Sequence, residues 1–139
     1  MKRFVLDASV SLRWFLDNPV PAYAIRVKQH LSDGARALVP SLWLLEMANG
    51  IVVAERRGMM SSGDADLCVA QTEQLAAHWI ESATESSPIR DIFTTARAFH
   101  LSSYDAAYLE LARRSGLPLA TLDQPLRTAA SQAGVDLLR

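Results

Sequence analysis

The chain has 139 residues, with 14 Lys and Arg against 15 Asp and Glu, and a formal net charge of -1. This length fits one domain, and a hydrophobic content of 50% is enough to form a continuous core. The single cysteine excludes an internal disulfide, and no apolar run approaches the roughly 18 residues that a membrane-spanning helix needs. The first apolar run stops at Asp7 after three residues, too early for a signal peptide. We therefore expect one domain over residues 1–139, located in the cytoplasm.

The predicted elements alternate between strand and helix. In chain order, the hydrophobic pattern and the positions of proline and glycine predict a strand at 3–7, helices at 10–16 and 22–32, a strand at 35–39, helices at 42–57 and 62–77, a strand at 78–82, helices at 89–100 and 104–114, a strand at 118–122, a helix at 125–133 and a strand at 135–138. Strands separated by helices favour an α/β fold, with a central parallel sheet of five strands and helices on both faces.

Four acids from distant segments are predicted to meet at one edge of this sheet. Asp7 ends the first strand, and Asp123 follows the strand at 118–122. Glu46 lies in the second turn of the helix that leaves the second strand, and Asp105 opens a helix that leads back into a strand. Functional sites of parallel sheets form outside the carboxyl ends of the strands. All four acids are expected at that edge.

Carboxylates that lie within a few ångströms of one another repel, and each raises the pKa of its neighbours. Such a group persists where a proton or a cation neutralises it. An all-oxygen ligand set suits Mg²⁺ or Mn²⁺ rather than zinc. A divalent ion held in this way can serve phosphodiester hydrolysis, because it stabilises the charge on the phosphate and carries water as a nucleophile.

Three of these acids also have a structural explanation. Asp7 can cap the helix that follows it, and Ser102 with Asp105 fits a capping box. The helix after the strand at 118–122 can be capped either by Asp123 or by Thr121. Taken singly, each of these three acids is more readily explained as a cap than as a metal ligand.

Glu46 is harder to explain in this way. Its neighbours along the helix at i±3 and i±4 are Leu42, Trp43, Asn49 and Gly50, none of which is basic. An acid on an apolar helix face needs a tertiary partner or a metal, because its charge is costly to bury alone. The alternatives for Glu46 are therefore a metal ion and an ion pair with an arginine from elsewhere in the chain.

The segments around these acids resemble the PIN-domain nucleases, in particular the VapC-type toxins of type II toxin–antitoxin pairs. Order and spacing agree over nearly the whole chain. The resemblance is carried by four stretches: Val5-Leu6-Asp7-Ala8-Ser9-Val10; Pro40-Ser41-Leu42-Trp43 continuing to Glu46-Met47-Ala48-Asn49; Leu101 through Ala112, with Ser103-Tyr104-Asp105-Ala106-Ala107-Tyr108 at its centre; and Leu119-Ala120-Thr121-Leu122-Asp123.

This resemblance implies an Mg²⁺- or Mn²⁺-dependent endoribonuclease that acts as a toxin. It implies a homodimer, silenced by an antitoxin whose C-terminal segment covers the groove. Carried over by position, the catalytic and metal-binding acids would be Asp7, Glu46, Asp105 and Asp123, with Asp7 and Asp105 in direct contact with the metal. Ser9, Asn49 and Thr121 would hold these acids in place.

Two other classes of function compete with a nuclease. A phosphatase or phospho-accepting domain would use Asp7 as a nucleophile at a strand end, but Ser9 stands where such phosphatases carry a second acid. In a non-catalytic binding module, the acids would serve as helix caps. The near-neutral charge is unusual for an RNA-binding protein. If a cation neutralises four of the acids, however, 11 acids remain against 14 basic residues.

Overall fold

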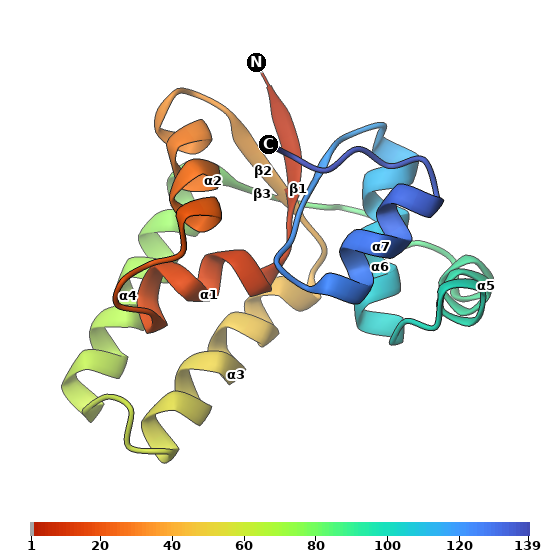
Figure 1. Ribbon diagram of the computed structural model, residues 1–139. Coiled ribbons are helices and arrows are strands. Elements are labelled where there is room, and N and C mark those ends of the chain that lie inside the picture. Colours follow the sequence, from red (N-terminus) through yellow and green to blue (C-terminus); the bar gives the residue numbers. More distant parts are fainter. Residues whose placement is uncertain (1) are drawn as a thin grey trace.

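The computed structural model describes residues 2–139, which form four strands and seven helices (Figure 1). In chain order the elements are β1 (Arg3–Leu6), α1 (Ala8–Leu16), α2 (Ala22–Ser32), β2 (Arg36–Val39), α3 (Leu42–Arg56), α4 (Ser62–Trp79), β3 (Ile80–Ser82), α5 (Ile89–Phe99), α6 (Ser103–Ser115), β4 (Leu119–Ala120) and α7 (Gln124–Gln132). The strands pair in parallel, in the order β3-β2-β1-β4. The predicted α/β class and parallel sheet are confirmed.

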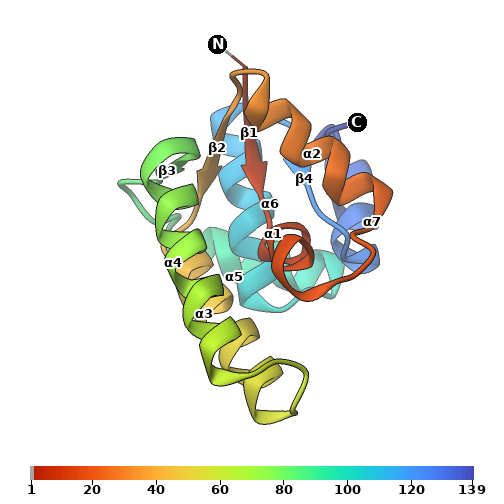
Figure 2. The same cartoon turned by 90° about the vertical axis from the view of Figure 1, so that its left-hand side faces the viewer.

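Helices cover both faces of the sheet, as predicted. The helices α1, α2 and α4 lie on one side, and α5, α6 and α7 lie on the other (Figure 1). A view turned by 90° shows α1, α2 and α4 in front of the strands (Figure 2). The helices α3 and α4 form a hairpin that extends past the carboxyl edge of the sheet. The N-terminal half of α3 therefore lies next to the ends of the strands.

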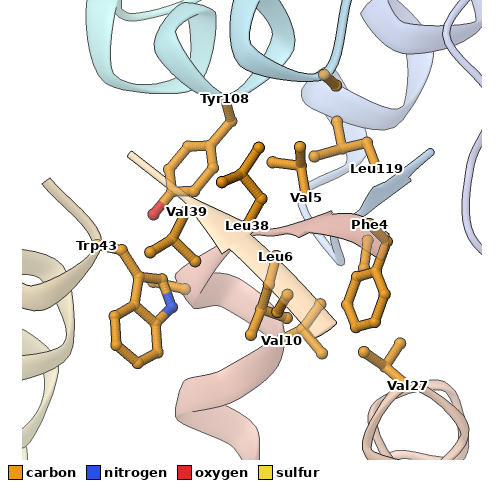
Figure 3. Packing of buried hydrophobic residues seen from close by; sticks show 14 of the residues in the cluster. Phe4, Val5, Leu6, Val10, Val27, Leu38, Val39, Trp43, Tyr108 and Leu119 are labelled. Carbon is orange, nitrogen blue, oxygen red and sulfur yellow. The ribbon is translucent and has the colours of Figure 1, made fainter. Parts of the chain in front are cut away.

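The core lies on both faces of β1, because this strand is in the middle of the sheet. Phe4, Val5 and Leu6 are each at most 1% exposed. Alternate side chains of a strand point to opposite faces, so Phe4 and Leu6 pack toward Val10 and Val27, while Val5 points toward α6 (Figure 3). A strand buried on both faces reads as a continuous apolar run rather than an alternating one.

The prediction of a fifth strand at 135–138 is wrong. This segment meets the sheet in one isolated parallel bridge between Leu119 and Leu137. Two backbone hydrogen bonds hold it, from Leu119 N to the Asp136 carbonyl oxygen at 2.8 Å and from Leu138 N to the Leu119 carbonyl oxygen at 2.9 Å. The reason is the length of β4, which has two residues and offers no longer edge for pairing.

The other boundaries differ from the predictions by a few residues. The helix α4 continues to Trp79, which shortens the strand expected at 78–82 to Ile80–Ser82. The helix α1 begins at Ala8 rather than at residue 10, directly after the strand. Among the helices of residues 2–139, none is both long enough and apolar enough to cross a bilayer.

Candidate active site

One cavity at the carboxyl edge of the sheet brings the four acids together. It measures about 620 Å³, and Asp7, Glu46, Asp105 and Asp123 all line it. Each acid comes from a different place: the end of β1, the second turn of α3, the start of α6 and the start of α7. None of the residues that line the cavity is Lys, Arg or His. The topology thus gathers negative side chains here without a basic neighbour in the lining.

Asp7 is the most deeply placed of the four, with 4% of its surface exposed. Its Oδ2 accepts hydrogen bonds from Ser9 Oγ at 2.6 Å and from Thr121 Oγ1 at 2.7 Å. Burial raises the pKa of this carboxyl, the two hydroxyl donors lower it, and the charge of Asp123 raises it further. Asp7 occupies the N-cap position of α1, but its side chain makes no capping hydrogen bond. The hydroxyls of Ser9 and Thr121 are therefore the main hydrogen-bond partners of the Asp7 side chain.

Ser9 and Thr121 form a small hydroxyl network around Asp7. Their oxygens lie 3.2 Å apart, and each also accepts a hydrogen bond from the backbone of the 120s loop. Leu122 N donates to Ser9 Oγ at 3.0 Å, and Asp123 N donates to Thr121 Oγ1 at 3.0 Å. The network joins the end of β1 to the segment after β4. It therefore fixes the orientation of the Asp7 carboxylate. Both hydroxyls donate to Oδ2, and neither donates to Oδ1.

Glu46 has a tertiary partner that the sequence reading missed. The hydroxyl of Tyr108 donates to Glu46 Oε1 at 2.6 Å and links α6 to α3. Tyr108 is fully buried, and Figure 3 shows its hydroxyl oxygen near Trp43 at the start of α3. No arginine pairs with Glu46 within residues 2–139, so the ion-pair alternative is wrong. Partial burial raises the pKa of Glu46, and the charges of Asp7 and Asp105 raise it further, against the lowering by Tyr108.

Asp105 lies in the first turn of α6, where the Ser102 hydroxyl caps the helix by accepting a hydrogen bond from Asp105 N at 3.1 Å. The pKa of its carboxyl is raised to about 6. Desolvation is the main cause, and the charges of Asp123 and Asp7 add to it. The carboxyl is therefore protonated over a wider pH range than an exposed aspartate.

Asp123 does cap a helix, as its alternative explanation predicted. Its Oδ2 accepts a hydrogen bond from Leu126 N at 3.0 Å, at the start of α7. Thr121, the other predicted cap, instead donates its hydroxyl hydrogen to Asp7. Asp123 still lines the cavity and raises the pKa of both Asp7 and Asp105. The capping bond uses one carboxylate oxygen, so Oδ1 is not committed to it.

The donor chemistry of this cavity fits a divalent cation. The ligands on offer are carboxylate oxygens, and none of the four acids forms a salt bridge in the described part of the chain. Desolvation by burial and, to a lesser extent, repulsion between the acids raise the pKa of Asp7, Glu46 and Asp105, and a bound cation would offset both effects. Over residues 2–139, no three His, Cys, Asp or Glu side chains converge into a ready coordination shell. Ligation would therefore draw the carboxylates closer or include water, as Mg²⁺ commonly does.

The predicted role of Asn49 can be compared with the geometry. Asn49, expected to hold Glu46, lines the same cavity, and its side chain makes no hydrogen bond to Glu46 within the described residues. Tyr108 makes the hydrogen bond to Glu46 that was expected from Asn49. The signal in the sequence was its position three residues after Asp105, which places both on one side of a helix.

The fold and this arrangement of acids define the class of protein. The family model of the PIN domain matches residues 4–131. The chain belongs to the PIN domain family, whose members are generally nucleases that use divalent metals.

Solved structures share this fold at low sequence identity. PAE2754 from Pyrobaculum aerophilum superposes with a TM-score of 0.71 and 21% identity, covering 92% of this chain and 84% of its own. FitAcB from Neisseria gonorrhoeae gives 0.68 and 16%, with 98% and 96% covered. A domain of a functionally unknown protein from Methanocaldococcus jannaschii gives 0.56 and 17%, with 100% and 92% covered. No curated protein sequence matches the chain significantly. At these identities, the likeness concerns the fold alone.

Proposed function

We propose that residues 1–139 form one PIN-type nuclease domain that hydrolyses phosphodiester bonds in RNA with Mg²⁺ or Mn²⁺. One observation carries the proposal: four carboxylates from four elements line one cavity that contains no basic side chain. Membership of the PIN family supports the nuclease chemistry. The phosphatase alternative gains no support. Asp7 shares its cavity with three further acids, and two hydroxyls hold its carboxylate in one orientation, as expected for a metal ligand.

In this proposal, Asp7 and Asp105 are direct ligands of the ion. The hydroxyls of Ser9 and Thr121 keep Asp7 in one orientation, as the partners of metal ligands commonly do. Tyr108 fixes Glu46 at the side of the cavity, where its carboxylate orients water or accepts its proton. Asp123, anchored at the start of α7, contributes its second oxygen directly or through water. When bound, the cation supplies charge stabilisation at the phosphate being attacked.

We further propose that the protein is a VapC-type toxin that acts as a homodimer and is silenced by a cognate antitoxin. The sequence resemblance around all four acids supports this assignment. Two large apolar or aromatic side chains that line the cavity are exposed: Leu45 is 73% exposed and Tyr104 is 65% exposed. Exposed apolar side chains in the lining of a site are suited to a partner that covers it. A second copy and an antitoxin segment are the partners we propose.

The direct test is cleavage of a structured RNA by the purified protein with Mg²⁺ or Mn²⁺, against the same reaction in EDTA. We expect metal-dependent endonucleolytic products, which Asp7→Asn abolishes. A matched control is Asp66→Asn, because Asp66 is an exposed acid in α4 that does not line the cavity. Equal cleavage by the wild type and Asp7→Asn would refute the proposal.

Light scattering of the wild type and Leu45→Glu tests the proposed homodimer. We expect the introduced glutamate charge to dissociate it.

A further inference from the structure

A second charged cavity lies at the β4 edge of the sheet, between α2, α7 and the segment 134–139. Figure 2 shows α2, β4 and α7 next to one another on this side of the molecule. The cavity measures about 900 Å³. Its charged and polar lining consists of Tyr23, Arg26, Arg127, Ser131, Asp136 and Arg139. We call it the arginine cavity, because three of these side chains are guanidinium groups.

Tyr23 organises this lining. Its hydroxyl donates to the Leu138 carbonyl oxygen at 2.8 Å, which holds the ring against the segment 134–139. Two guanidinium groups lie over the ring, with Arg127 Cζ 5.0 Å and Arg26 Cζ 5.5 Å from its centroid. Cation–π contacts of this kind fix the position of an arginine without using its N–H donors. The donors of Arg26 therefore remain available to a ligand.

The three arginine side chains of the arginine cavity form no salt bridge within residues 2–139. Asp136 also lines it but forms no ion pair with the three arginines in the part of the chain that the structure describes. Three guanidinium side chains against one carboxylate side chain give the lining an excess of positive side chains, in a protein whose formal charge is -1. Planar guanidinium groups bind phosphate through paired N–H donors. The chemistry of the lining thus fits a phosphate ester.

One residue connects the arginine cavity to the acids. Arg127 Nη1 donates to the Thr121 carbonyl oxygen at 2.7 Å, and Thr121 Oγ1 donates to Asp7 at 2.7 Å. The two cavities are therefore adjacent along the edge of β4. A polyanion whose reacting phosphate lies at the acids would bring a neighbouring phosphate toward the arginines.

We propose that the arginine cavity binds backbone phosphates of the RNA strand that the acid cavity cleaves. The inference rests on the proposed function, since it takes RNA as the ligand. Arg26 and Arg139 supply the contacts, while Arg127 is both a contact and a support for Thr121. The cavity sets affinity for the strand and leaves the chemical step to the carboxylates.

The test measures RNA binding without cleavage. A fluorescent single-stranded oligoribonucleotide is titrated with the Asp105→Asn protein in Mg²⁺, and the anisotropy is followed at several salt concentrations. Adding Arg26→Gln and Arg139→Gln is expected to weaken binding about tenfold, and to make log K less steep in log salt by about 1.4, or about 0.7 per lost phosphate contact. Arg127 is left intact, because its loss would also disturb Thr121.

The matched control carries Arg56→Gln and Arg57→Gln at the far end of α3, which removes the same charge away from both cavities. Binding that falls only in the Arg26/Arg139 pair supports the proposal. Equal loss in both pairs, or no loss in either, overturns it. A parallel NMR titration with inorganic phosphate that saturates at Arg26 while RNA binding is unaffected would assign the cavity to a free anion and also overturn it. Because no step requires cleavage, these outcomes are separate from failure of the nuclease activity itself.

Discussion

The acid cavity and the arginine cavity are neighbours with opposite charge, and they are built differently. In the acid cavity, short side chains come from strand ends and the first two turns of helices, and hydroxyls of Ser9, Thr121 and Tyr108 hold two of them in place. In the arginine cavity, long side chains from α2, α7 and the segment 134–139 gather around one tyrosine ring. Thr121 contacts both, with its hydroxyl on one side and its carbonyl on the other.

This difference matches the roles that we propose for the two cavities. A reacting group must be positioned within a fraction of an ångström, which requires short side chains with fixed partners. Holding a flexible strand requires charge and reach, which long arginine side chains provide. In our proposal, the acids set the turnover and the arginines set the affinity for RNA.

The largest expected effect is on the kinetics of RNA cleavage, where the acids and the arginines should change different constants. Asp105→Asn should lower the rate of RNA cleavage at saturation by about 1,000-fold, because it removes a proposed metal ligand and a charge at the reacting phosphate. Arg26→Gln with Arg139→Gln should instead raise KM about tenfold, with little change in kcat. Single-turnover and steady-state kinetics measure both. If Arg26→Gln with Arg139→Gln lowers kcat as much as Asp105→Asn does, the arginines do not act on affinity alone and the comparison is contradicted.

Thr121→Val sharpens the comparison, because it removes the hydroxyl but keeps the carbonyl that receives Arg127. Loss of a hydrogen bond to a metal ligand typically costs 10- to 100-fold in metal affinity, and we expect a change of about that size for Mn²⁺. RNA affinity in the arginine cavity should stay within about twofold of wild type. Calorimetry with Mn²⁺ and RNA anisotropy test the two halves. A parallel fall in both would show that the cavities are not separable at this residue.

Tyr108→Phe removes the donor to Glu46 while keeping the aromatic ring in the core. We expect a destabilisation of about 1 kcal/mol in urea unfolding, since Glu46 is only partly buried and water can replace the hydroxyl. We also expect about a tenfold lower kcat. Tyr104→Phe is the matched control, because Tyr104 lines the same cavity but is 65% exposed. If both variants behave alike, Tyr108 does not position Glu46.

The smallest effect is a pH dependence of stability. The pKa of Asp105 is raised from 3.8 to about 6, so the folded protein retains a proton that the unfolded chain has lost. This contribution to the unfolding free energy is therefore present below pH 3.8 and is lost as the pH rises to about 6. Relative to wild type, metal-free Asp105→Asn should melt at a higher temperature at pH 7.5 and show no such gain at pH 4. An advantage of equal size at both pH values would contradict the raised pKa.

Much of the site follows from the sequence, because parallel topology alone decides where strand ends and helix starts meet. Asp7 and Asp123 were placed at one edge by the strands that they follow, and Glu46 and Asp105 by the helices that contain them. Features that depend on one segment alone, such as helix ends, also follow from the sequence. Asp123 caps α7 as a local rule predicts, and Gly58 ends α3 with a φ of +73°, a conformation that glycine adopts without strain.

What sequence did not reveal depends on tertiary partners. The bond between Tyr108 and Glu46 joins residues 62 positions apart, and a tyrosine in an amphipathic helix is commonly only a core residue. The prediction of a fifth strand was wrong. The apolar segment after Gly134 has the pattern of a strand, but its neighbour β4 is too short to form a ladder with it. The arginine cavity requires the packing of α2 against the segment 134–139, which no local pattern encodes.

The most direct measurement of the central claim is calorimetric titration of Mn²⁺ into the wild type, Asp7→Asn and Asp66→Asn at pH 7.5. The account predicts saturable binding to the wild type and to Asp66→Asn, and its loss in Asp7→Asn while circular dichroism shows an intact fold. Binding of Mn²⁺ to all three proteins with equal affinity would contradict it, since the ion would then be held without the carboxylates that line the acid cavity.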